Sequence, residues 1–350
     1  MQVTQGHSTR RTVTVMVTLA VSLLVLAVAC MLVGKVDIPA GNVWAVMTGG
    51  SSGNEAWDII ILESRLPMIV TAMLAGAALS VSGLLLQTTF NNPLAGPSIL
   101  GVSTGAGLGV AVVMLAMGGT VGGIFGQTVG SYVATLLGAL VGAGVVLAIL
   151  IAFSSIVKNS TVLLIIGILV SYLASSIISL LNSLATEEGI SSYVAWGFGT
   201  FSGVTMTQLP VFASLIVISL VVASLMVKPL NAMLMGTRYA TNMGVDVNHS
   251  RNMLLLVTGV LTAVVTAFCG PIGFVGMVVP HVARLMLGTS NHTRLLPATM
   301  LAGACVALLC TLISVAGKHG VIPINAITPV IGVPIIIYLI VNRRKIQYFN

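Results

Sequence analysis

Ionisable and nucleophilic side chains are scarce in this chain, and we find no catalytic or metal-binding pattern among them. The 350 residues include 14 Lys and Arg, seven Asp and Glu and five His, and no H-E-x-x-H zinc motif occurs. The four cysteines lie in apolar runs without a C-x-x-C pair, which is typical of buried free thiols. Neither the His nor the 17 Met form a ligand cluster. We therefore predict no catalytic residue, no metal site and no cofactor bound by this chain.

A nucleotide-binding loop is also missing from the sequence. Gly34-Lys35 and Gly317-Lys318 lack both the upstream Gly and the following hydroxyl residue of the pattern G-x-x-x-x-G-K-[ST]. The run from Gly105 to Gly109 lacks the strand–turn–helix context of such a loop. Its G-x-x-x-G spacing recurs at Gly138 and Gly142 and predicts close helix packing. If ATP drives this protein, a separate chain must bind it.

The elements that position the few polar residues must be helices embedded in lipid. Hydrophobic residues make up 57% of the chain and charged residues only 6%, whereas a soluble domain carries about 25% charged residues. This composition excludes soluble enzymes, nucleic-acid-binding proteins and disordered chains. The net charge of +7 comes from basic residues that are mostly scattered singly, so it reflects membrane topology rather than a nucleic-acid surface.

Continuous apolar runs favour helices over the alternating strands of a β-barrel, because about 20 residues cross ~30 Å of hydrocarbon. We predict an all-α polytopic membrane protein with about ten transmembrane helices. Their expected ranges are 13–34, 65–86, 93–116, 127–153, 161–184, 207–228, 252–270, 272–288, 296–316 and 326–342.

The positions of Lys and Arg predict the orientation. With ten spans both termini share one side, and a cytoplasmic location puts 11 of the 14 Lys and Arg inside and six of the seven Asp and Glu outside. We expect a cytoplasmic tail at 1–12, a single transmembrane domain at 13–345 and a cytoplasmic tail at 346–350. A cytoplasmic segment at 229–251 and a short periplasmic helix at about 190–200, with Trp196 at headgroup depth, interrupt the spans.

Three classes of membrane protein remain open on these grounds. No Asp or Glu lies in the middle of a span, which argues against a proton-coupled secondary transporter, although Na⁺ sites made of carbonyl and hydroxyl groups would escape this test. A transporter driven by a separate ATPase and a scaffold without cargo are the other two classes.

Two blocks of sequence narrow the choice. The first joins Gln87 to the run Asn92-Pro93-Leu94-Ala95-Gly96-Pro97-Ser98-Ile99-Leu100-Gly101 and to Gly105, and the second runs from Gly270 to Arg284. Together they resemble the signatures of the FecCD-type permeases, the membrane subunits of ABC importers for iron–siderophores, haem and cobalamin. The motif positions are Gln87, Pro93, Pro97, Gly101, Gly105, Gly273, Gly276, Pro280, His281 and Arg284.

The resemblance implies the type II ABC importer architecture in a bacterial inner membrane. A second permease copy, a dimer of cytoplasmic ABC ATPase subunits and a periplasmic substrate-binding protein are the implied partners, and ATP with Mg²⁺ binds to the ATPase. The implied ATPase contacts are Arg238, Tyr239, Ala240, Asn242, Met243 and Gly244. The implied cytoplasmic gate is Asn92, Leu94, Ser160 and Thr161, and the implied docking residues for the binding protein are Arg65 and Lys318.

The chain departs from the family pattern on the outer side. R-x-P-R reads Arg65-Leu66-Pro67-Met68, Asp-x-x-x-Arg ends at Lys318, and P-x-G reads Pro323-Ile324-Asn325. Lys318 keeps a charge but loses the bidentate fork of Arg. These departures fit a divergent binding protein, or a heterodimer in which the other chain supplies the arginines. For the cargo, an iron–siderophore or haem is the first expectation and cobalamin the second; the alternative of another class is an ion-coupled secondary transporter.

Overall fold

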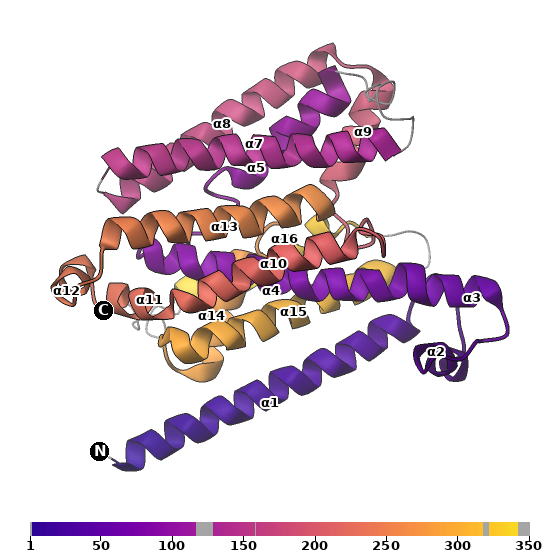
Figure 1. Cartoon of the computed structure of the whole chain (residues 1–350), viewed down its shortest axis with the longest axis horizontal. Coiled ribbons are helices and arrows are strands. Elements are labelled where there is room, and N and C mark those ends of the chain that lie inside the picture. The colour runs from indigo at the N-terminus through magenta and orange to yellow at the C-terminus, as the bar shows by residue number, and fades with distance from the viewer. Residues whose placement is uncertain (1, 117–128, 158, 318–321, 342–350) are drawn as a thin grey trace.

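The computed structural model describes residues 2–116, 129–157, 159–317 and 322–341, and every regular element within them is helical (Figure 1). The elements, of which η1 and η2 are π-helical, are α1 (Gln2–Leu32), α2 (Ala40–Met47), α3 (Glu55–Ile59), η1 (Ile60–Arg65), α4 (Leu66–Thr89), α5 (Val102–Ala111), η2 (Val112–Ala116), α7 (Val129–Ile156), α8 (Ser160–Leu184), α9 (Glu187–Gly197), α10 (Leu209–Leu225), α11 (Val227–Leu234), α12 (Thr237–Asn242), α13 (Val247–Cys269), α14 (Val275–Leu287), α15 (His292–Val315) and α16 (Ile324–Val341).

The core is built around α4, which is apolar on all sides and almost completely buried. Helices α13, α14, α15 and α10 pack against it. Gly76 of α4 and Gly303 of α15 allow α4 and α15 to approach closely, because a Cβ on Gly76 would stand 2.2 Å from the Gly303 carbonyl oxygen. Small residues in lipid-embedded helices permit this kind of backbone contact.

A second group of helices, α5, α7 and α8, packs on the other side of α13 (Figure 1). The predicted glycine pairs meet here, since a Cβ on Gly109 would lie 1.8 Å from the Gly138 carbonyl oxygen and one on Gly142 would lie 2.1 Å from that of Gly105. The prediction of close helix packing at these four residues is confirmed.

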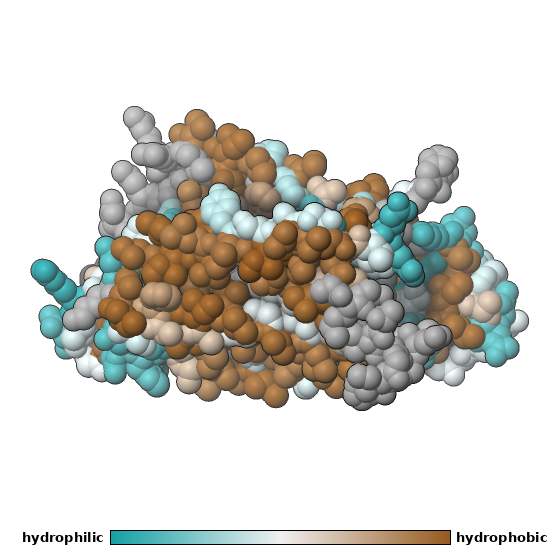
Figure 2. Space-filling view, turned by 90° about the horizontal axis from the view of Figure 1, so that it is seen from above, coloured by the Kyte–Doolittle hydropathy of each residue, from teal (hydrophilic) through white to brown (hydrophobic). Residues whose placement is uncertain are grey.

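The face of the molecule seen in Figure 2 is mostly apolar along its middle and polar at its two ends. Helix α1 runs along α15 at one edge and exposes a row of large aliphatic side chains, and α7, α8 and α10 do the same elsewhere. Exposed apolar surface of this extent requires lipid or a partner chain to cover it. A membrane lying across the long helices satisfies this requirement.

The helices agree with the predicted spans in order, but a count of ten crossings is not confirmed. In the described residues six helices are long and apolar enough to cross a membrane. Helices α10 and α11 meet at a bend of 50°, and if the pair is counted as one span the number rises to seven. The expected span 93–116 is helical only from Val102, because 93–101 forms turns. The expected span 272–288 contains α14, whose 13 residues reach about 20 Å at ~1.5 Å each.

The two polar ends carry different elements (Figure 1). The start of α1, the segment α11–α12 and the starts of α13 and α15 lie at one end, whereas α2, α3 and α9 lie at the other. Helix α1 is already formed from Gln2, where we expected a tail. The expected tail 346–350 lies outside the described residues.

Candidate functional site

A cavity of about 560 Å³ lies between α5, α8 and α9, and the segment before α14 and the first turn of α16 close it. The residues that line it are Ser98, Ser103, Thr104, Gly107, Ser175, Ile178, Ser179, Asn182, Ile190, Tyr193, Val194, Trp196, Gly197, Pro271, Ile272, Gly273 and Asn325.

The described residues that line this cavity combine hydroxyl and amide groups with a larger apolar area, and none of them is charged. Ser175, Ser179 and Asn182 follow one another at helical spacing, so α8 presents hydroxyl and amide groups along one face. Within the part of the chain that the structure describes, no group of three or more His, Cys, Asp or Glu is placed to hold a metal ion. The arrangement therefore suits a large organic molecule with polar groups rather than a bare cation.

Helix α9 supplies an aromatic wall to the cavity. The rings of Tyr193 and Trp196 stack with centroids 6.1 Å apart, and burial raises the pKa of the Tyr193 phenol, which keeps it protonated at neutral pH. Gly107 of α5 lies beneath both rings, because a Cβ there would stand 3.4 Å from the Tyr193 hydroxyl oxygen. Trp196 thus lines the cavity, which the amphipathic pattern of α9 alone does not reveal. Its expected place at headgroup depth stays a prediction.

The motif residues Gln87, His281 and Arg284 come from two distant blocks and form one buried cluster. Arg284 Nη1 donates a hydrogen bond of 2.7 Å to Gln87 Oε1, and Gln87 Nε2 donates one of 3.1 Å to the Met277 carbonyl oxygen. Gln87 Nε2 also lies 3.4 Å from His281 Nδ1. All three side chains of the cluster are less than a tenth exposed. The cluster fixes the last turn of α4 against α14.

The glycines of the motif act through packing and backbone geometry. Gly101 has φ +82° at the start of α5, and a Cβ there would meet Ser171 Oγ at 2.7 Å. Gly276 lies in contact with Leu79 of α4 and with Pro97, since a Cβ would stand 2.7 and 2.8 Å from their atoms. Gly273 lines the cavity instead.

The predicted gate residues lie in two separate turns. Asn91 has φ +45°, and the following turn is closed by hydrogen bonds from Asn92 N to the Gln87 carbonyl oxygen, 3.0 Å, and from Leu94 N to Asn92 Oδ1, 2.9 Å. Leu94 is exposed. Ser160 and Thr161 form the first turn of α8, which Asn159 caps by accepting a 2.8 Å hydrogen bond from Thr161 N. A gating role for these four residues stays a prediction.

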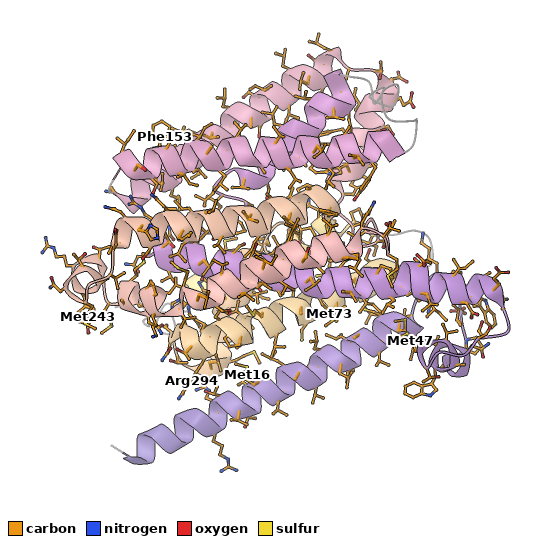
Figure 3. The ribbon with its side chains drawn as sticks, in the orientation of Figure 1. Met16, Met47, Met73, Phe153, Met243 and Arg294 are labelled. Carbon is orange, nitrogen blue, oxygen red and sulfur yellow. The ribbon has the colours of Figure 1, made fainter. Side chains whose placement is uncertain are left out.

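The residues predicted to contact an ATPase form α12 and its C-terminal turn. Ala240 is buried and anchors the helix, whereas Tyr239 and Met243 expose 46% and 64% of their surface. Gly244, at φ +82°, ends the segment as expected. Figure 3 shows Met243 at the α12 end, away from the bundle. Exposed apolar side chains at a polar end favour a protein partner.

Of the two predicted docking residues, Arg65 lies in the described part of the chain and Lys318 does not. Arg65 is only 4% exposed, and its guanidinium donates hydrogen bonds to the carbonyl oxygens of Met31 and Leu32 in the last turn of α1 and of Val36 beyond it. In this arrangement Arg65 ties α1 to the start of α4, and docking of a binding protein would have to displace it. Lys318 lies outside the described residues.

Sequence reasoning missed two kinds of residue. Asn231 of α11 and His292 of α15, which lie 61 positions apart, are joined by hydrogen bonds, and no local pattern announces such a pair. Ser103 stands in a run spelled G-x-S-x-G from Gly101 to Gly105, which is the spelling of a hydrolase nucleophile elbow. Ser103 lies in the first turn of α5, and its hydroxyl shares a 3.3 Å hydrogen bond with Thr266 Oγ1 near the end of α13, in which either oxygen can be the donor.

Known proteins similar to this chain share both its sequence pattern and its fold. The model of the FecCD transport family matches residues 22–342. The vitamin B12 import system permease protein BtuC of Citrobacter koseri is 32% identical over 322 residues, which cover 91% of this chain and 94% of that protein. The hemin transport system permease protein HmuU of Yersinia pestis is 30% identical over 336 residues, covering 93% and 95%. A solved chain of an inward-facing ABC transporter, described as metal-chelate type, matches with a TM-score of 0.82 and 28% identity, covering 93% of this chain and 98% of that one.

Proposed function

Because this chain belongs to the FecCD transport family and is an ABC importer permease, we propose that it carries an iron–siderophore or haem across the bacterial inner membrane. A second permease copy completes the pathway, a separate ATPase dimer drives it from the cytoplasmic side, and a periplasmic protein delivers the cargo. In this orientation α12 faces the cytoplasm together with the start of α1.

The observation that carries the proposal is the uncharged lining of the cavity. A free metal ion is held by carboxylate, imidazole or thiolate groups, and the cavity wall offers none of them. Hydroxyl and amide groups on α8 and the rings of Tyr193 and Trp196 match a cargo with a polar rim and extended apolar faces. A chelate, in which the organic ligand encloses the metal, has this surface.

Cobalamin, itself a cobalt chelate, is the second candidate. It is favoured by the 32% identity to a protein whose name gives vitamin B12 as its cargo. The uncharged lining offers a corrinoid the same polar and aromatic groups, so the cavity chemistry supports the chelate class more strongly than any one member.

The experiment that tests the cargo is uptake into proteoliposomes that contain the complex with its ATPase and ATP. A ferric siderophore, haem, cobalamin and free Fe³⁺ are each supplied with the binding protein outside. We expect saturable uptake of the siderophore or haem, which an excess of the same chelate inhibits. Uptake of cobalamin alone would replace the first candidate by the second, and uptake of free Fe³⁺ in preference to the chelates would refute the proposal.

A further inference from the structure

A buried hydrogen-bond chain joins α11 to α15 and α4 at the polar end that carries α12. Asn231 lies in the middle of α11, whose Leu230 and Met233 are buried, and α12 follows three residues after α11 ends. Helix α11 packs against both α4 and α15. A displacement of α12 by a partner is therefore transmitted directly to Asn231.

The second step of the chain is His292, the first residue of α15, whose side chain is fully buried. His292 N donates a 2.8 Å hydrogen bond to Asn231, which identifies the facing Asn231 atom as Oδ1 because a backbone N–H needs an acceptor. The same Oδ1 lies 3.0 Å from His292 Nδ1, so Nδ1 carries the proton. In the neutral ring Nε2 then accepts, and the Thr88 hydroxyl, which lies 2.8 Å from Nε2 and 3.2 Å from the Leu84 carbonyl oxygen, is the donor at the shorter distance.

The third step leads to the turn after α4. Thr88 follows Gln87, whose side chain is held by Arg284 and whose carbonyl oxygen accepts the hydrogen bond from Asn92 N at 3.0 Å. Asn92 in turn closes the turn that exposes Leu94. The last turn of α4 is thus fixed on one side by α14 and on the other by His292, and the turn with Leu94 begins directly from it.

We propose that Asn231, His292 and Thr88 form a relay that transmits movement of the α11–α12 segment to the turn of Asn92 and Leu94. These are positioning residues: none touches the cavity, and they act through the turn. The inference rests on the proposed function, because it takes the partner at α12 to be the ATPase. It adds to that function a specific path from the ATPase contact to the gate.

The test uses the complex with its co-purifying ATPase, carrying Leu94→Cys as a reporter in detergent. The four native cysteines are buried, so a polar maleimide reports on position 94. Its labelling rate is measured with and without a non-hydrolysable ATP analogue. Two substitutions of His292 each keep one of its two side-chain contacts and remove the other. An Asn side chain can place its amide nitrogen where Nδ1 stands, so His292→Asn keeps the contact with Asn231, whereas His292→Gln keeps the contact with Thr88.

We expect the nucleotide-dependent change in labelling rate to shrink about two- to tenfold in Asn231→Ala, His292→Asn and His292→Gln, the fold equivalent of about 0.5–1.4 kcal/mol for one net hydrogen bond. The double variant Asn231→Ala/His292→Asn should reduce the nucleotide-dependent change little more than either single variant, because both substitutions interrupt the same path. The matched control is Asn42→Ala in α2 at the opposite end, which likewise removes an amide that is hydrogen-bonded to the backbone. Asn42 Nδ2 donates to the Ser52 carbonyl oxygen at 3.0 Å, whereas Asn231 Oδ1 accepts from His292 N. It should leave the response unchanged.

The outcomes separate this inference from the proposed function. An unchanged response in all three variants, or a lower thermal midpoint with an intact response, would mean that His292 only stabilises the start of α15, and the relay would be wrong. If the parent complex shows the nucleotide-dependent change in labelling and the variants lose it, but the parent takes up no chelate, the relay is supported and the proposed cargo is refuted. A parent that does not respond to nucleotide at all would refute the relay, whereas chelate uptake by the same complex would still support the proposed function.

Discussion

Gly83 of α4 is the position at which a single methyl group tests the packing behind the motif cluster. An added Cβ would stand 1.7 Å from the carbonyl oxygen of Gly276 and 2.3 Å from its carbonyl carbon. Both neighbours are backbone atoms, so no side chain can rotate away. Gly83→Ala therefore forces α4 and α14 apart one turn before Gln87.

The size of the effect follows from this geometry. Ordinary contact begins at 3.4 Å, so the two backbones must separate by up to 3.4 − 1.7 = 1.7 Å. Overpacking typically costs about 1–3 kcal/mol, and a gap of ~1 Å already forfeits up to about half of the dispersion energy of the atoms that lose contact. We expect a loss of about 3 kcal/mol, at the upper end of this range, because the obstruction is backbone.

The assay is the thermal midpoint of the purified complex, with ATP-driven uptake measured in parallel. Gly144→Ala in α7 is the matched control, because nothing lies within 4 Å of its added Cβ, and Ala favours a helix over Gly by about 1 kcal/mol. Gly83→Ala should lower the midpoint by several degrees and reduce uptake, whereas Gly144→Ala should leave both unchanged or raise the midpoint. Equal midpoints for the two variants would refute the close contact between α4 and α14.

Three further substitutions test separate parts of the account. Arg238→Glu in α12 should reduce ATPase association or hydrolysis-coupled uptake at least tenfold (about 1.4 kcal/mol) with normal membrane insertion; unchanged co-purification and uptake would remove α12 from the ATPase contact. Arg65→Gln should lower the thermal midpoint, because the guanidinium bonds that tie α1 to α4 are lost and charged hydrogen bonds contribute about 1.5–3 kcal/mol each; loss of stimulation by the binding protein at an unchanged midpoint would instead support a docking role. Trp196→Ala should raise the KM of uptake several-fold and keep the basal ATPase rate, since the ring lines the cavity and is not part of α12, the predicted ATPase contact; an unchanged KM would mean that the cargo does not contact this wall.

Composition and local pattern were sufficient to predict the fold class. A surface that faces lipid needs few charged residues, and the thickness of the bilayer sets the length of the apolar runs, so both features can be read without knowing how the helices pack. Glycine spacing also predicted the contact between α5 and α7 at Gly105, Gly109, Gly138 and Gly142. The boundaries were less predictable where backbone geometry decides them. The run 93–101 reads as apolar, but two prolines and the left-handed Gly101 keep it in turns until α5 begins.

The candidate site could be predicted only where residues adjacent in sequence act together. The segment around Arg238 and the turn of Asn92 and Leu94 are candidates of this kind, and the roles of both stay predictions. The cavity combines α5, α8, α9 and α16, and the pair Asn231–His292 joins helices 61 positions apart. Such contacts depend on how the helices pack, and no periodicity within one helix encodes them. The resemblance implied that Arg65 docks the binding protein, whereas in the structure three backbone carbonyl groups accept hydrogen bonds from its buried guanidinium.

The most direct test of the central claim is purification of the tagged chain from its native host in mild detergent, followed by ATP-driven uptake with every protein that co-purifies. The account predicts recovery of an ATPase with a Walker motif together with a second permease chain, and uptake that stops when the Walker lysine of the ATPase is replaced. Repeated recovery of this chain alone, with uptake that follows an ion gradient and ignores ATP, would contradict it.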